Sequence, residues 1–201
     1  MINRRAALLA HNAGIWEGTF VRLDGEGREQ ERFASHLEVS EQEGTIEAAL
    51  TNGSSGNVRR MSFREPPAEM QIAAAGHWSL GPDRIGPWPW ISELCLVHGE
   101  RRRRVVLRHG SESLESLVVV CEGRPEQREP APPAPLQLEP QYGAEAPGQQ
   151  LWKPEAGLEI ETIARRQPGS PQRLALRWSP EPGLRLELVR GHDAYGLLQP
   201  L

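Results

Sequence analysis

The feature that most constrains the fold is an alternating run near the start of the chain, residues 16–23 (WEGTFVRL), which follows Gly14. Alternation with a period of two predicts a β-strand with two different faces, and it places Trp16, Gly18 and Phe20 on the same face. Glycine allows the backbone to turn tightly beside a large indole. We therefore interpret Gly14, Trp16 and Gly18 as the floor of a β-barrel.

Segments with strand character continue to residue 122, separated by turn signals at the spacing of a sheet that curls. After the first strand, which ends near Gly25, the expected strands cover residues 29–40, 45–51, 58–64, 70–75, 90–97, 102–109 and 114–121. About eight strands are enough to close a small barrel whose interior holds side chains or one small ligand. Ahead of them, Ala6, Leu8 and Leu9 indicate a short helix across one end of the barrel.

The composition changes after residue 124. Prolines recur from Pro125 to Pro147 and indicate a semi-rigid linker. Residues 148–201 then alternate again in three or four short segments, too few to close a barrel alone. We predict an all-β fold: an antiparallel barrel with its helix over residues 1–124, a linker over 125–147, and a partial second β unit, a degenerate barrel half, over 148–201. The edge strands of that C-terminal unit suggest a homodimer.

Composition and charge argue against several classes of function. The formal net charge is -4, whereas a nucleic-acid-binding protein needs a basic face. No segment approaches the roughly 18 apolar residues of a membrane-spanning helix. Cys95, Cys121 and the histidines show no metal-ligand spacing, so we expect neither a metal nor another cofactor. Two cysteines are too few for a disulfide framework and fit a reduced, cytoplasmic protein.

The best-defined pair of strands is a hairpin over residues 90–97 and 102–109. Gly99 suits the two-residue turn between them, and that turn places Leu94 opposite Val105. One face of the hairpin is then apolar and the other charged, with Leu94, Leu96, Val105 and Leu107 on the first and Glu93, Arg102, Arg104 and Arg108 on the second.

The charged face has two possible orientations. If it points outward, it is a solvated lattice in which each ion pair contributes about 0–1 kcal/mol. If it points inward, its arginines need compensation, either from a buried carboxylate network or from an anionic ligand. The apolar face competes for the interior, and this favours the outward orientation.

A group of tryptophans precedes the hairpin: Trp88-Pro89-Trp90, with Trp78 nearby. Exposed tryptophans often mark recognition surfaces, so Trp88 and Trp90 are candidates for a lip over the barrel mouth. The alternative is a loop that folds back and plugs the barrel, since the neighbouring glycines and prolines stiffen it.

Two segments resemble a known family. The similarity lies in the pattern Asn12-x-Gly14-x-Trp16-x-Gly18, followed by residues 93–104 (ELCLVHGERRRR) and 117–122 (LVVVCE). The family that the chain resembles is largely cyanobacterial and is catalogued as domain of unknown function 3598. The resemblance covers residues 8–124. It implies a lipocalin-like (calycin) barrel, in a family often built as two related barrel halves. The family brings no established activity.

We expect non-catalytic binding of a small hydrophobic or amphipathic ligand in the barrel, and the organisms of the family suggest a pigment, a tetrapyrrole or a lipid-like molecule. The candidate residues are Phe20, Leu94, Val105 and Leu107 as walls, Trp88 and Trp90 as the lip, and Arg103 or Arg104, beside Glu93, for an acidic end of the ligand. One alternative is an enzyme (an isomerase, cyclase or chromophore lyase) that uses Glu93 against Arg104. The other is a protein-interaction module with a filled barrel.

Overall fold

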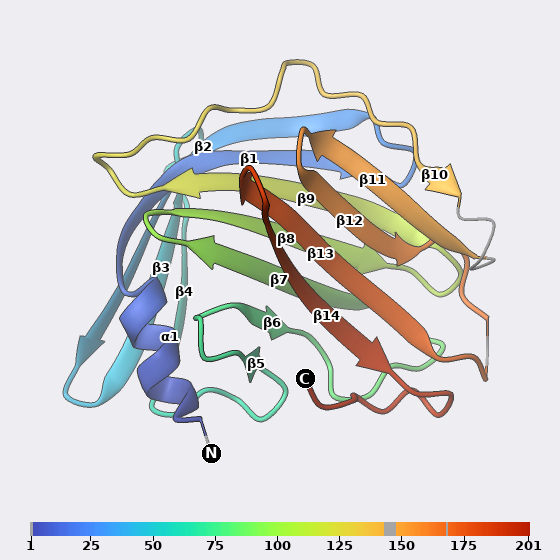
Figure 1. Ribbon diagram of the computed structural model, residues 1–201, viewed down its shortest axis with the longest axis horizontal. Helices are drawn as coiled ribbons and strands as arrows, with labels where there is room; N and C mark the ends of the chain where they lie inside the picture. Colours follow the sequence, from blue (N-terminus) through green and yellow to red (C-terminus); the bar gives the residue numbers. More distant parts are fainter. Residues whose placement is uncertain (1, 143–147, 168) are drawn as a thin grey trace.

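The computed structural model describes residues 2–142, 148–167 and 169–201, which form antiparallel strands and one short helix (Figure 1). In chain order the elements are α1 (Arg4–Asn12), β1 (Gly14–Asp24), β2 (Glu29–Gln42), β3 (Thr45–Asn52), β4 (Val58–Phe63), β5 (Gln71–Ile72), β6 (Trp78–Leu80), β7 (Trp90–His98), β8 (Arg101–His109), β9 (Leu114–Gly123), β10 (Gln141–Tyr142), β11 (Gln149–Glu155), β12 (Leu158–Ile163), β13 (Gln172–Glu181) and β14 (Leu184–His192). Nine strands form one sheet in the order β4-β3-β2-β1-β9-β8-β7-β6-β5, and five form a second in the order β10 to β14. The predicted all-β, barrel-like fold is confirmed.

The nine-stranded sheet curls around α1 and forms a cup with a concave and a convex face (Figure 1). Helix α1 begins after Asn3, whose side chain accepts a hydrogen bond from the N–H of Ala6 at 2.9 Å. The predicted short helix is confirmed, and its Leu8 is buried against the concave face. Within the described ranges no strand pairing joins β4 to β5. We refer to the two edge strands β4 and β5 together as the seam.

Alternation along the strands sends neighbouring side chains to opposite faces of the cup. Trp16 belongs to a buried cluster on the concave face together with Leu8. Val21 and Leu23 belong to the core on the convex face. That core also contains residues of the second sheet, among them Trp152, Ile160, Leu176 and Trp178. The five-stranded sheet therefore packs against the convex face of the cup.

The Pro-rich segment that leads from the first sheet to the second is held against the cup. Leu136 and Leu138 are buried in the convex-face core, and the N–H of Leu138 donates to the carbonyl oxygen of Gly27 at 2.9 Å. The predicted linker is thus anchored on the first sheet within residues 125–142, and its last residues, 143–147, lie outside the described part of the chain. Both sheets contribute to one core. The division of the chain into two separate domains stays a prediction.

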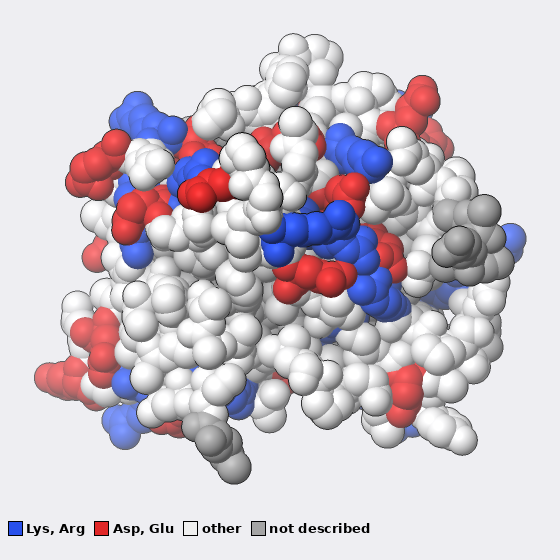
Figure 2. All heavy atoms as spheres, viewed as in Figure 1, with Lys and Arg blue, Asp and Glu red and all other residues white. Residues whose placement is uncertain are grey.

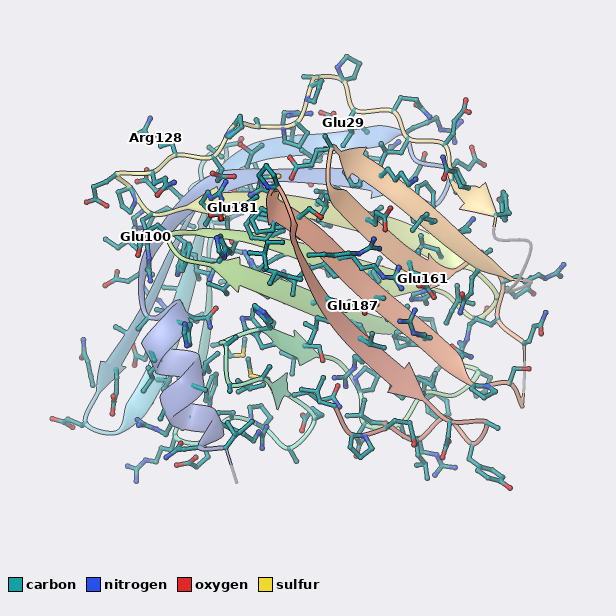
Figure 3. All side chains as sticks on the ribbon, in the orientation of Figure 1. Glu29, Glu100, Arg128, Glu161, Glu181 and Glu187 are labelled. Atoms are coloured by element: carbon teal, nitrogen blue, oxygen red, sulfur yellow. The ribbon has the colours of Figure 1, made fainter. Side chains whose placement is uncertain are left out.

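The outer face of the five-stranded sheet carries a lattice of ion pairs. Arg173 and Arg177 each bond to Glu161 and Glu187, at distances between 2.5 and 3.1 Å. Figure 2 shows basic and acidic side chains alternating over this sheet, and Figure 3 shows Glu161 and Glu187 on it. Surface pairs of this kind contribute about 0–1 kcal/mol each and suit a solvated face. Strand β14 is one edge of the sheet, and the homodimer through that edge stays a prediction.

The core between the sheets contains a histidine that makes stability depend on pH. His109 has no exposed surface, and its ring lies 4.2 Å from the ring of Trp90, centroid to centroid. Burial lowers the pKa of His109 from 6.5 to about 3, and the positive charge of Arg166 acts in the same direction. Between pH 6.5 and about pH 3 the unfolded chain binds a proton at this histidine that the folded protein excludes. The stability of the folded protein therefore falls as the pH falls through this range.

At pH 5 this group is expected to lower the free energy of unfolding by about 2 kcal/mol relative to neutral pH. His109→Gln should remove that part of the pH dependence, measured by urea denaturation at both pH values. The control is His36→Gln, at a side chain that is 45% exposed, and it should keep the wild-type dependence. A pH dependence unchanged in His109→Gln would show that other groups cause it.

Candidate functional site

The concave face of the cup holds a cavity of about 270 Å³ beside α1, termed here the inner cavity. Helix α1 and strands β2, β3 and β4 contribute to its lining, as do β6, β7 and β8 on the other arm of the cup. The apolar residues that line it are Leu8, Leu37, Val39, Ile46, Ala48, Leu50, Met61, Phe63, Met70, Trp78 and Leu80. A concave and mainly apolar lining with a few polar groups is typical of small-molecule sites.

The polar wall of the inner cavity is a buried network of two arginines and two glutamates. Glu122 of β9 has no exposed surface, and its carboxylate accepts hydrogen bonds from Arg102 Nε at 2.6 Å and from Arg104 Nη2 at 2.8 Å. Arg104 Nη1 donates in turn to Glu93 Oε1 at 2.5 Å. These four side chains are named the quartet below. Two positive and two negative charges make it neutral as a whole, which is the condition for burying charges at this depth.

The pKa of Glu122 indicates that this carboxylate is ionised at neutral pH. Burial raises this pKa, but the guanidinium groups of Arg102 and Arg104 outweigh burial and lower it to about 2. For Arg104, burial lowers the pKa, and the carboxylates of Glu122 and Glu93 more than offset this and raise it. A carboxylate that stays ionised and accepts from two arginines is poorly suited to proton transfer near neutral pH. Glu122 therefore joins β8 to β9 electrostatically.

Trp16 lies on the concave face next to the quartet. The guanidinium carbons of Arg102 and Arg124 lie 4.2 and 3.8 Å from the centroid of its ring, so both arginines make cation–π contacts. The indole N–H donates to the carbonyl oxygen of Asn12 at 3.0 Å. Trp16 has no exposed surface, and its role as the floor of a barrel stays a prediction.

Two glycines of β1 make this arrangement possible. Gly14 has a φ of 99°, in the left-handed region that favours glycine. At Gly18 a Cβ atom would lie 2.1 Å from the carbonyl oxygen of Cys121 and 2.6 Å from Glu122 Cγ. Gly18 thus leaves the space through which the Glu122 side chain reaches its arginines.

A second cavity, of about 770 Å³, lies farther along the concave face and is termed the outer cavity. Phe20 and Phe33 stack in its wall, with ring centroids 5.0 Å apart. Two ion pairs also belong to its lining, Arg22 with Glu31 at 3.3 Å and Arg108 with Glu115 at 2.8 Å. Its lining also includes the uncharged polar residues Asn52, Ser55, Asn57 and Ser116. The outer cavity is therefore more polar than the inner one.

The predicted hairpin and its register are confirmed. Leu94 pairs with Val105 and Ser92 with Leu107, and Gly99 in the turn has a φ of 55°.

The charged face of the hairpin points into the cup, and Arg102 and Arg104 are buried there. The inward orientation is therefore correct for these arginines and the outward one wrong, whereas Arg108 farther along the same face stays 55% exposed. The physical reason is the second sheet, which covers the convex face and buries the apolar side of the hairpin there.

This packing corrects the predicted cavity walls. Leu94, Val105 and Leu107 have no exposed surface and belong to the convex-face core, so they do not share a cavity with Phe20. Arg103 points to the convex side as well, where two carboxylates accept its hydrogen bonds at 2.5 and 2.6 Å. Strand alternation separates Arg103 from the cup, because its neighbours in the sequence on both sides belong to the quartet.

Of the residues predicted for ligand binding, the structure brings together on the concave face Phe20, Glu93 and Arg104. The sequence prediction missed Glu122, although a signal for it exists. Strand β8 pairs with β9 such that Arg102 lies directly opposite Glu122, and a short turn between two adjacent strands predicts a register of this kind.

The tryptophans expected at the lip lie in three different places. Trp78 lines the inner cavity, and its indole N–H donates to Asn12 Oδ1 at 3.1 Å. Trp90 is buried on the convex side against His109, whereas Trp88 is 51% exposed. Strand β7 begins at Trp90, and alternation along it directs this side chain away from the cup. A common aromatic lip is therefore not formed.

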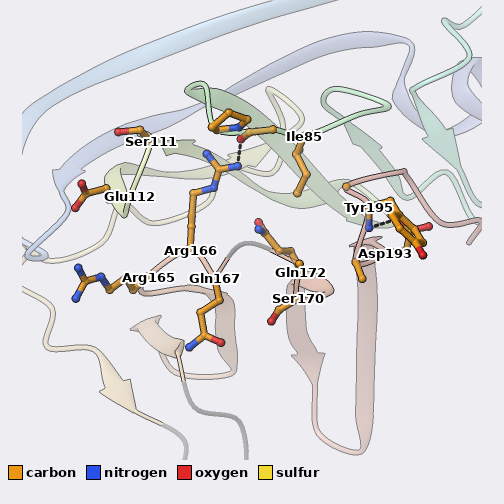
Figure 4. Close-up of a pocket in the computed structure, with 15 residues that line it drawn as sticks. Ile85, Ser111, Glu112, Arg165, Arg166, Gln167, Ser170, Gln172, Asp193 and Tyr195 are labelled. Atoms are coloured by element: carbon orange, nitrogen blue, oxygen red, sulfur yellow. Dashed lines mark hydrogen bonds between the residues drawn. The ribbon is translucent and has the colours of Figure 1, made fainter.

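A third cavity, of about 490 Å³, lies among loops that belong to both sheets (Figure 4). The guanidinium group of Arg166 donates to the carbonyl oxygens of Trp88 at 3.0 Å and Gly110 at 3.2 Å, and also to that of Gly86. Burial lowers the pKa of Arg166. This side chain ties three loop segments together, so we assign it a structural role.

Other chemistry has few candidates in the described part of the chain. There, no group of three or more His, Cys, Asp and Glu side chains is arranged to hold a metal ion. Likewise, no helix in the described ranges has both the length and the apolar character to cross a membrane. Cys95 and Cys121 are buried and free, and burial raises the pKa of each thiol to about 12. Neither thiol forms a reactive thiolate at neutral pH.

Comparison with known proteins extends these observations. The N-terminal model of the family described as domain of unknown function DUF3598 matches residues 1–127. The crystal structure of a protein of unknown function from the DUF3598 family of Nostoc punctiforme is similar, with a TM-score of 0.77 and 18% sequence identity. The alignment covers 98% of this chain and 96% of that one. At this identity the likeness concerns the fold alone. Among curated proteins none matches the chain.

Proposed function

Since the chain belongs to the DUF3598 family, whose function is unknown, its role has to be inferred from its own cavities, and we propose that it binds a small, mainly apolar molecule in the inner cavity without transforming it. The family membership expected from residues 12–18 and 93–122 is confirmed. The observation that supports the proposal is the lining of the inner cavity, which combines apolar side chains with one charge-neutral polar wall.

The size of the inner cavity favours a slender ligand. Its volume of about 270 Å³ is just below the range of about 300–1,000 Å³ that is usual for ligand pockets. A lipid-like chain or a small aromatic molecule fits this space. A tetrapyrrole or another pigment would have to extend into the outer cavity. The protein-interaction alternative predicts a filled barrel, whereas the cavities of the cup favour binding of a small molecule.

Filling the inner cavity should abolish binding. Ala48 of β3 lines this cavity, and Ala48→Phe places a ring in it. We expect this variant to bind the neutral fluorescent probe N-phenyl-1-naphthylamine at least about tenfold more weakly than the wild type, because the ring takes the space in which apolar surface of the probe is buried. Probe fluorescence titrated against protein measures the affinity.

The matched control is Ala49→Phe, at the next residue of the same strand. Its side chain points to the opposite face of the sheet, so probe binding should stay at the wild-type level. Urea denaturation of both variants tests whether each one folds. Equal probe binding by the two folded variants would contradict the inner cavity as the binding site.

The natural ligand is accessible by native mass spectrometry of the protein purified from its own host. We expect a stoichiometric added mass that disappears after denaturation and is absent from Ala48→Phe. An added mass retained by this variant would place the ligand elsewhere.

A further inference from the structure

The inner and outer cavities lie on one concave face and share part of their lining. Leu50 of β3 and Arg59 of β4 line both cavities. These two residues are also paired directly across the two strands, so Arg59 lies on the same face of the sheet as Leu50. Strand β4 is the edge of the sheet at the seam. Arg59 therefore stands where the two cavities meet.

The charges of the two linings are not balanced. Apart from Arg59 and Arg60, each charged side chain of the two linings belongs either to the quartet or to one of two ion pairs. These pairs are Arg22–Glu31 and Arg108–Glu115. Arg59 and Arg60 are exposed, and among the described residues neither has a carboxylate within ion-pair distance. The cup thus carries a surplus of positive charge at the seam, although the chain as a whole has a net charge of -4.

The quartet is a poor partner for an anionic ligand. Both oxygens of Glu122 and one oxygen of Glu93 already accept hydrogen bonds from Arg104 and Arg102. An anion placed there would compete with carboxylates that are already buried and oriented, and it would leave them uncompensated. Arg59 has no such competitor.

We infer that the ligand is an anionic amphiphile, whose apolar body occupies the inner cavity and whose acidic group is held by Arg59 at the junction of the two cavities. This inference rests on the proposed function and names the ligand class and the anchoring residue for the same site. It replaces Arg103 and Arg104, the anchors expected from the sequence. Arg60 pairs with Ala49 and therefore starts from the opposite face of β4, but as an exposed neighbour on the same edge strand it adds to the positive potential there.

An arginine on an edge strand also discourages pairing with other chains. That role needs only the charge and predicts no preference among ligands. The two interpretations differ in one measurable quantity, the ratio of the affinities for an anionic probe and for a neutral probe of the same shape.

The experiment uses 1-anilinonaphthalene-8-sulfonate as the anionic probe and N-phenyl-1-naphthylamine, which has the same ring framework without the sulfonate, as the neutral probe. We expect the wild type to prefer the anionic probe, and Arg59→Gln to weaken its binding by about threefold to tenfold, as for loss of one partly exposed charged hydrogen bond. Binding of the neutral probe should not change. Arg59→Lys, which keeps the charge, should restore most of the preference, and added salt should reduce it.

The control is Arg64→Gln, just beyond the end of β4 and outside both linings; it should behave as the wild type does. An unchanged ratio of the two affinities in Arg59→Gln would overturn this inference and leave the proposed function in place, provided that Ala48→Phe still blocks the neutral probe. If the wild type binds neither probe, the proposed function fails as well. A preference lost equally in Arg64→Gln would mean that net charge, and not Arg59, sets it.

Discussion

Glu122→Gln is expected to lower the free energy of unfolding by about 3–5 kcal/mol, because removing one partner of a buried ion pair leaves the other charge uncompensated. Glu122 has no exposed surface and is the acceptor shared by Arg102 and Arg104. A glutamine can still accept one hydrogen bond, but it brings no negative charge. Urea denaturation at neutral pH, followed by tryptophan fluorescence, measures the change.

Glu115→Gln is the matched control for this prediction. Glu115 also lies on β9 and also pairs with an arginine of β8, Arg108, but the two side chains of this pair are 48% and 55% exposed. Its loss should cost less than about 1 kcal/mol, as for other surface pairs. Similar losses in the two variants would show that burial does not set the contribution of the quartet.

Trp16→Ala is expected to cost about 3–5 kcal/mol as well, for a different reason. Removing a fully buried aromatic side chain leaves a void that the surrounding structure closes only in part. The substitution also removes the ring over which Arg102 and Arg124 lie. Because Arg102 belongs to the quartet, Trp16→Ala and Glu122→Gln should be coupled, and the double variant should lose less stability than the two single losses added together.

Trp88→Ala serves as the control, since Trp88 is 51% exposed. This substitution should change the free energy of unfolding by less than about 1 kcal/mol, as is usual at the surface. A small loss for Trp16→Ala in the same assay would mean that the packing of the concave face does not depend on the indole, and the floor predicted at Trp16 would be wrong.

The predictable part of the fold consists of features set by neighbouring residues. The run at residues 16–23 forms part of β1, and the hairpin has the expected register because the turn at Gly99 allows few alternatives. Alternation also predicted that the two faces of the hairpin differ in polarity. These features need only the pleat of a strand and the geometry of a turn.

The candidate site was less predictable, because it depends on residues that the curl of the sheet brings together. Ala48, Met61 and Trp78 line one cavity only because nine strands bend around α1. That bend accumulates from small twists between successive strands, and no single segment encodes it. Arg59 in particular has no local pattern that distinguishes it from the other arginines of the chain.

The sequence by itself determined that the chain forms antiparallel strands, that Trp16 lies on a buried face, and that the hairpin over residues 90–109 has one apolar and one charged side. Only the tertiary structure decided which side faces a cavity. The apolar side is covered by strands β11–β14, which are distant in the chain, and the charged side is left to line the cup. Whether a face is buried depends on the surface that packs against it, and that surface is not encoded in the strand itself.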